Sequence, residues 1–230
     1  MRFIFITFLI SIFSSIIPKE NFTHMTDLTK KIYNFLAIGD SYTIGESVLL
    51  QQSFPCQTVQ LLRNAGYSFN SPEIIAKTGW TTDELQAAIN DHKFLPRYDF
   101  VTLLIGVNNQ YRGRSVENYQ TEFENLLKQA IQFAGNDTSH VFVLSIPDWG
   151  VTPFAEGRDR KQIAKDIDAY NTVNKTISEK YKVHYIWITA GTREATNDPT
   201  LLATDGLHLS AKEYKRWAVK LCDKIKLQLQ

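Results

Sequence analysis

The fold class follows from one stretch of the sequence, Val101-Thr102-Leu103-Leu104-Ile105-Gly106-Val107-Asn108-Asn109. Its first five residues form a continuous run that is apolar apart from one threonine. Such runs are typical of strands that are covered on both faces, as in parallel sheets. The run ends abruptly in a glycine and then two asparagines. The stretch therefore predicts an interior parallel strand followed by a polar loop.

Four other β-rich runs lie along the chain, and segments with helical spacing separate them. The five predicted strands cover residues 32–38, 73–76, 100–105, 141–146 and 183–188. Alternating strands and helices predict a parallel sheet with helices on both faces. No internal repeat, linker or change of composition follows residue 30, so we expect one domain over residues 30–230.

Two of the intervening segments carry an apolar stripe at helical spacing. The first stripe comprises Val116, Tyr119, Phe123, Leu126, Leu127 and Ala130, and the second comprises Tyr214, Trp217, Ala218, Leu221, Cys222 and Ile225. Capping boxes, in which a Ser or Thr is followed three residues later by Glu, mark two helix starts. They pair Thr81 with Glu84 and Ser210 with Glu213.

The composition excludes several classes of protein. The 230 residues include 25 basic and 24 acidic side chains, a balance that argues against a protein built to bind nucleic acid. A hydrophobic content of 43% is that of a globular chain rather than a disordered one. Two cysteines are too few for a zinc finger or a disulfide-dense scaffold. In an exported protein Cys56 and Cys222 could pair, and free thiols are an equal alternative.

The N-terminus has the pattern of a secretory signal. Met1-Arg2 precedes an apolar run over residues 3–17, which Pro18-Lys19-Glu20 ends. The run is shorter than the roughly 20 residues that a spanning helix needs. We expect residues 1–20 to be a signal peptide, which makes the mature protein secreted or periplasmic without a membrane span. An uncleaved membrane anchor and a buried first element are the alternatives.

Chemistry-bearing residues follow four of the predicted strands. In open parallel sheets, ligands bind outside the carboxyl ends of the strands. The first strand leads to Ser41, the second to Gly79 and the third to Asn108. The last loop holds Asp205 and His208, three residues apart. All of them are therefore predicted at one edge of the sheet.

These residue types suit acyl transfer. A serine hydroxyl becomes a good nucleophile when an imidazole takes its proton, and a carboxylate holds that imidazole in the right tautomer. Ser41, His208 and Asp205 could fill these three positions. The tetrahedral intermediate also needs donors to its oxyanion. The backbone N–H groups of Ser41 and Gly79 and the side-chain amide of Asn108 could supply them.

The four blocks resemble those of the SGNH, or GDSL, hydrolases, which are named after Ser, Gly, Asn and His. Ser41 matches the first block within Gly-Asp-Ser, and Gly79, Asn108 and His208 match the other three. The resemblance covers roughly residues 32–220. Tyr42 stands where many members have leucine. Asn109 stands where many have aspartate, which puts the support of its loop in question.

The resemblance implies a fold and an activity. The fold is a three-layer α/β/α sandwich, flavodoxin-like, around a central, mostly five-stranded parallel sheet. The activity is esterase or lipase-type hydrolysis that requires neither metal nor organic cofactor. Ser41 would be the nucleophile, His208 the general base and then acid, and Asp205 the orienting carboxylate. Gly79 and Asn108 would complete the oxyanion hole.

Other readings are weaker or remain open. An α/β-hydrolase is disfavoured, because its nucleophile lies in Gly-x-Ser-x-Gly and Thr43 occupies the last position here. No phosphate-binding, dinucleotide-binding or H-E-x-x-H metal motif occurs. An acyltransferase of the same fold and a non-catalytic carbohydrate- or lipid-binding relative remain open.

The expected substrate is a small-molecule, glycan or lipid ester. Short acyl groups are favoured, because no long apolar lid segment follows the N-terminal run. Acetylated carbohydrates and lysophospholipid-type esters are the named candidates. Aromatic residues near the candidate site, Tyr42, Trp80 and Trp149 together with Tyr111, are expected to contact the substrate.

Overall fold

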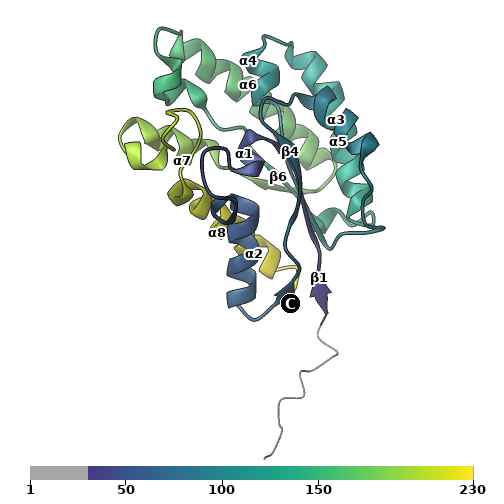
Figure 1. The fold of residues 1–230 in the computed structure, drawn as a ribbon. Coiled ribbons are helices and arrows are strands. Elements are labelled where there is room, and N and C mark those ends of the chain that lie inside the picture. The colour runs from purple at the N-terminus through teal and green to yellow at the C-terminus, as the bar shows by residue number, and fades with distance from the viewer. Residues whose placement is uncertain (1–30, 230) are drawn as a thin grey trace, which may run out of the picture. The chain divides into compact units, whose positions relative to one another are not determined.

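A five-stranded parallel sheet forms the centre of the computed structural model, which describes residues 31–229 (Figure 1). The strand order is β4-β2-β5-β6-β7, and every neighbouring pair is parallel. The strands are β2 (Phe35–Asp40), β4 (Glu73–Lys77), β5 (Phe100–Leu104), β6 (Val141–Leu144) and β7 (His184–Ile186). The predicted α/β class and parallel sheet are confirmed. The predicted signal peptide lies outside the described residues.

The long helices form two layers, one on each face of the sheet (Figure 1). On one face α2 (Phe54–Asn64) packs against α8 (Ala211–Lys226). On the other, α5 (Val116–Phe133) packs against α3 (Thr82–Asp91) and α6 (Arg160–Lys180). Right-handed crossovers are expected to give this division, because the chain steps from β2 to β4 and then reverses direction across the sheet.

Short elements complete the chain, and most of them lie in the loops that follow the carboxyl ends of the strands. The short strands and α-helices are β1 (Ile32–Tyr33), β3 (Ser68–Phe69), α1 (Ser41–Ile44), α4 (Val107–Tyr111) and α7 (Thr189–Arg193). The 3-10 turns are η1 (Leu50–Gln52), η2 (Thr138–His140), η3 (Trp149–Val151), η4 (Pro153–Ala155), η5 (Glu194–Thr196) and η6 (Pro199–Leu201).

The core lies between the sheet and its two helix layers. Strands β2, β5 and β6 are buried along their whole length, as continuous apolar runs predict. Both predicted stripes lie on helices, α5 and α8, and every stripe residue is buried except the half-buried Val116. Burying such stripes against a sheet is the main stabilising contribution of these amphipathic helices.

The predicted strand over residues 32–38 was wrong in its extent. It is two strands, β1 and β2, separated by Asn34. The carbonyl oxygen of Asn34 accepts the N–H groups of Asp99 and Phe100, and its own N–H donates to the Asp99 carboxylate at 2.8 Å. These bonds to the chain before β5 interrupt the strand. As a result β1 pairs with β3 in a separate two-stranded sheet.

One of the two predicted capping boxes was wrong. The Glu84 carboxylate accepts the Thr81 N–H at 2.9 Å at the start of α3, as expected. At the start of α8, however, the Ser210 hydroxyl donates to the Thr200 carbonyl at 2.7 Å. Glu213 is buried and accepts the indole N–H of Trp217 at 2.8 Å. Contacts with other parts of the chain therefore replace the local cap.

Two further findings bear on the cellular setting. Cys56 on α2 and Cys222 on α8 are free thiols. Within residues 31–229, no helix combines the length and the apolar character that crossing a membrane requires.

Candidate active site

Ser41 lies where the strand order of the sheet reverses. It follows β2, the strand between β4 and β5, and begins the short helix α1. The preceding Asp40 caps this helix by accepting the N–H of Tyr42 at 3.0 Å. Burial raises the pKa of Asp40 to about 7, and the hydrogen bond from Tyr42 acts in the opposite direction. A Cβ at Gly39 would lie 2.3 Å from the Leu104 carbonyl oxygen, so the strand requires glycine there.

A cavity of about 150 Å³ opens beyond the carboxyl ends of the strands. Ser41, Gly79, Asn108 and His208, each predicted from a different block, all line it. The other lining residues are Tyr42, Thr78, Val107, Tyr111, Trp149, Phe154 and Leu207. The topology thus brings four separated segments to one hollow.

His208 is bonded to Asp205. Its Nδ1 lies 2.6 Å from Oδ2 of Asp205, and the other carboxylate oxygen accepts the backbone N–H groups of Leu207 and His208, both at 3.0 Å. Burial raises the pKa of Asp205, but the hydrogen bonds from Ser47, His208 and these two N–H groups outweigh it and hold the pKa well below its usual range. Asp205 is therefore ionised at neutral pH. Its carboxylate can only accept hydrogen bonds, so the Nδ1 atom of His208 carries the proton between them. In a neutral imidazole, a proton on Nδ1 leaves Nε2 as an acceptor.

His208 and the segment that carries Ser41 are also in contact through Tyr42. The buried Tyr42 ring lies 5.2 Å from the His208 imidazole, measured between ring centroids. Burial, followed by the nearby Asp40 charge, raises the pKa of Tyr42, so the phenol stays neutral. Tyr42 thus forms an apolar wall against one side of the imidazole.

Hydrogen bonds connect the segment that carries Gly79 to the helix α4 that carries Asn108. The side-chain amide of Asn108, on α4, donates to the Trp80 carbonyl at 2.9 Å. Arg112, at the end of α4, donates to the Gly79 carbonyl at 2.6 Å. An amide nitrogen carries two hydrogens, so the bond to Trp80 orients Asn108, which lines the cavity, and uses only one of its N–H groups.

Asn109 supports its loop where many relatives use aspartate. It is buried, its oxygen accepts the Thr82 N–H at 3.1 Å, and its nitrogen donates to the Thr82 hydroxyl oxygen at 2.6 Å. The Thr82 hydroxyl donates its own proton to Glu122. Its oxygen therefore needs an N–H donor, which asparagine supplies and an ionised aspartate does not. The departure in sequence matches this local network.

Three aromatic rings form one wall of the cavity. Trp149, Tyr111 and Phe154 contact one another with ring centroids 5.4–6.1 Å apart. The Arg158 guanidinium lies over all three rings, 5.0–5.9 Å from their centroids. Of the predicted aromatic contacts, Tyr42, Tyr111 and Trp149 line the cavity, whereas Trp80 does not and contributes its backbone carbonyl.

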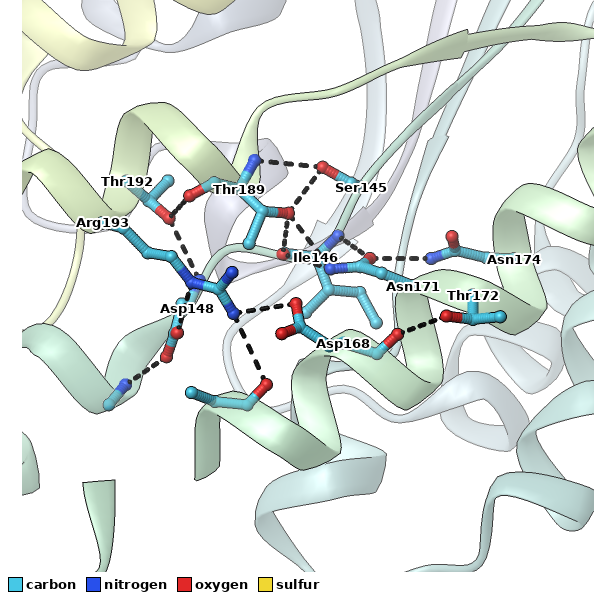
Figure 2. Close-up of polar contacts among 12 residues, drawn as sticks. Ser145, Ile146, Asp148, Asp168, Asn171, Thr172, Asn174, Thr189, Thr192 and Arg193 are labelled. Atoms are coloured by element: carbon cyan, nitrogen blue, oxygen red, sulfur yellow. Dashed lines mark hydrogen bonds and ion pairs between the residues drawn. The ribbon is translucent and has the colours of Figure 1, made fainter. Parts of the chain in front are cut away.

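A polar network fixes the loop that carries Trp149 (Figure 2). The Asp148 side chain is buried and pairs with Arg193 Nε at 2.8 Å, and Arg193 also reaches Asp168 on α6 at 2.8 Å. Ile146 lies two residues before Asp148. Its N–H donates to the amide oxygen of Asn171 at 2.7 Å, and its carbonyl accepts the amide N–H of Asn171 at 3.0 Å. These bonds take the place of a strand ladder, which explains why β6 is shorter than predicted.

Several residues at the site were not predicted. Phe154 completes the aromatic wall, Gln110 accepts the Trp149 indole N–H at 2.8 Å, and Ser47 donates to Asp205 at 2.6 Å. None of the three lies in a local motif that sequence analysis recognises. Among the described residues, no group of three or more His, Cys, Asp and Glu side chains is placed to hold a metal ion.

The comparison with known families agrees with the four blocks. The sequence model of the GDSL-like lipase/acylhydrolase family matches residues 37–216. The chain belongs to this family. As a member of the GDSL-like lipase/acylhydrolase family, the protein is a carboxylic ester hydrolase. A search of curated proteins found no match.

Solved structures of two esterases and of a lipase/acylhydrolase share the fold. Axe2, an acetylxylan esterase from Geobacillus stearothermophilus, is 19% identical with a TM-score of 0.67, over 84% of this chain and 94% of that one. A lipase/acylhydrolase from Enterococcus faecalis is 19% identical with a TM-score of 0.65, over 85% and 96%. The psychrotrophic esterase EstA from Pseudoalteromonas sp. is 16% identical with a TM-score of 0.63, over 86% and 98%. At these identities the likeness concerns the fold.

Proposed function

We propose that the protein hydrolyses esters of short acyl groups through Ser41, His208 and Asp205. The observation that carries the proposal is a shared cavity, lined by Ser41 and by a histidine whose Nδ1 is bonded to a carboxylate. In this mechanism Nε2 of His208 takes the Ser41 proton as the hydroxyl oxygen attacks the ester carbonyl. The imidazolium then gives that proton to the leaving alcohol oxygen. Water repeats the sequence on the acyl-enzyme.

The oxyanion would be held by donors from three blocks. The backbone N–H groups of Ser41 and Gly79 and the second amide N–H of Asn108 are the proposed donors. The bonds from Asn108 to Trp80 and from Arg112 to Gly79 support this assignment, because they fix two of the three segments before substrate arrives. Donors that are fixed in advance need no reorganisation as negative charge develops on the carbonyl oxygen.

The cavity supports a short acyl group. Its volume of about 150 Å³ is small beside the roughly 300–1,000 Å³ of pockets that enclose drug-sized ligands. Its aromatic wall offers apolar surface, and the polar network behind Asp148 holds that wall in place. Acetylated sugars are the substrates to test first, since the similar Axe2 is an acetylxylan esterase.

A chain-length series checks this substrate class. With p-nitrophenyl acetate, butyrate, octanoate and palmitate, we expect kcat/KM to be highest for acetate or butyrate, because longer chains do not fit behind the aromatic wall. Phe154→Ala, which removes a ring at the half-exposed rim, should move the optimum toward longer chains. A maximum at palmitate in the unaltered protein would contradict the proposal.

We further propose that residues 1–20 direct export and that residues 30–230 form the hydrolase domain of the mature chain. The support is the basic start and the short apolar run. N-terminal sequencing of the protein recovered from the periplasm or medium of an expressing bacterium should find the chain starting near residue 20. Recovery of the full-length chain from the membrane fraction would favour the uncleaved anchor instead.

A further inference from the structure

Ser47 lies outside the four blocks but contacts the proposed triad. Its hydroxyl donates to Oδ2 of Asp205 at 2.6 Å, the same oxygen that receives Nδ1 of His208 at 2.6 Å. Ser47 and Asp205 are 158 residues apart in the chain. The helix α1 starts at Ser41, six residues before Ser47. The bond therefore connects the loop after α1 to the loop that carries His208.

The Asp205 carboxylate needs an external partner on this oxygen. Its side chain is 30% exposed, whereas that of His208 is 8% exposed. The backbone N–H groups of its own turn hold Oδ1, whereas the partners of Oδ2 are His208 and Ser47. Water competes for an exposed carboxylate oxygen. A fixed hydroxyl on Oδ2 limits the rotation of the carboxylate away from the imidazole.

The backbone at Ser47 is strained. Its φ of +65° lies in the left-handed region, which residues other than glycine rarely adopt. Glycine would suit this backbone better, so a serine at this position carries a conformational cost. Strained residues of this kind cluster at functional sites.

The same loop contacts a third block. The carboxylate of Glu46, next to Ser47, accepts the hydroxyl of Thr78, which precedes Gly79. Glu46 thus contacts the segment that carries Gly79, a proposed oxyanion donor. Ser47 contacts the segment that carries His208, the proposed base. A loop with such contacts is placed to set the geometry of the site.

We propose that Ser47 is a positioning residue that holds the Asp205 carboxylate against His208. The inference rests on the proposed roles of Asp205 and His208. Ser47 exchanges no proton with the substrate and acts by keeping Oδ2 in line with the Nδ1–H. When it is lost, the imidazole spends less time in the productive tautomer and orientation, so kcat falls while KM stays nearly constant.

Two substitutions separate positioning from stability. Ser47→Ala and Ser47→Gly both remove the hydroxyl, but glycine relieves the left-handed backbone and should raise stability relative to alanine. We expect both variants to lose about tenfold in kcat on p-nitrophenyl acetate, the scale of one partly exposed hydrogen bond to a charged group. If the role of Ser47 is structural only, activity should follow stability, and the glycine variant should match the unaltered protein.

A double-mutant cycle and a spectroscopic signal complete the test. In an Asp205→Ala background, Ser47→Ala should lower kcat no further, because its effect passes through the carboxylate. The low-field proton resonance of the His208 Nδ1–H should shift in both Ser47 variants. Ser115→Ala, which loses a hydroxyl cap on α5 and does not line the cavity, should leave kcat and this resonance unchanged.

The outcomes distinguish this inference from the proposed function. If Asp205→Ala or His208→Ala retains full activity, the triad itself is wrong. If those variants are impaired and both Ser47 variants have the kcat and the resonance of the unaltered protein, the triad stands and the role of Ser47 is overturned. Additive effects of Ser47→Ala and Asp205→Ala would also overturn it.

Discussion

The Ser41→Ala variant is expected to lose ester hydrolysis almost completely, with a fall in kcat on the order of 10⁶-fold. Ser41 is the proposed nucleophile, and alanine cannot form the acyl-enzyme. The side chain is nearly buried at the end of β2, so removing one oxygen leaves the packing of the strand and of α1 in place. The loss should therefore appear in catalysis and not in folding.

Hydrolysis of p-nitrophenyl acetate, followed at 400 nm on matched concentrations of both proteins, measures the effect. A residual rate of about 10³–10⁴-fold over water would reflect the oxyanion donors and substrate binding without the nucleophile. Thermal unfolding of the two proteins provides the control and should give closely similar Tm values. Equal rates for the two proteins would show that Ser41 is not the nucleophile.

The sheet could be predicted from the sequence because its strands carry their own signal. A run such as Val101 to Ile105 is apolar enough to require cover on both faces, and chirality then restricts the topology. The break at Asn34 could not be predicted, because it depends on hydrogen bonds to Asp99 and Phe100, 65 or more residues away. The local sequence around Asn34 is compatible with one long strand.

The candidate site shows the same division. Ser41, Gly79 and Asn108 were found because a parallel sheet brings the ends of its strands to one edge, whatever the loops do in detail. The residues that hold the site in place through hydrogen bonds could not be predicted from the sequence. Ser47 and Arg112 act through single hydrogen bonds to Asp205 and to the Gly79 carbonyl, and these depend on loop conformations that no periodicity encodes.

The aromatic wall illustrates why residue type alone is a weak guide to a substrate contact. Trp80 and Trp149 both follow strands of the sheet, yet Trp149 lines the cavity and Trp80 does not. The difference lies in what holds each loop. The Asp148–Arg193 pair fixes the loop before Trp149, and Gln110 receives its indole N–H. Trp80 instead packs against the hydrophobic core while its carbonyl anchors Asn108.

The Asn108→Ala variant is expected to lower kcat by about 10²–10³-fold, as is typical when one oxyanion donor is removed. The proposed role of the second amide N–H is confined to the transition state, so KM should change little. The substitution also releases the Trp80 carbonyl, but that group lies at a partly buried position where water can replace the lost partner. Steady-state kinetics on p-nitrophenyl acetate give both parameters.

The neighbouring asparagine supplies a matched control for this prediction. Asn109→Ala deletes the same chemical group one residue later, but there the amide holds the buried Thr82 N–H and hydroxyl. Leaving buried polar groups without partners costs about 1–3 kcal/mol. We therefore expect Asn109→Ala to lower the free energy of unfolding, measured in urea, with a much smaller loss of kcat than Asn108→Ala. If the two variants lost the same kcat at equal stability, the special role of Asn108 as an oxyanion donor would be refuted, because the adjacent amide cannot reach the cavity that Asn108 lines.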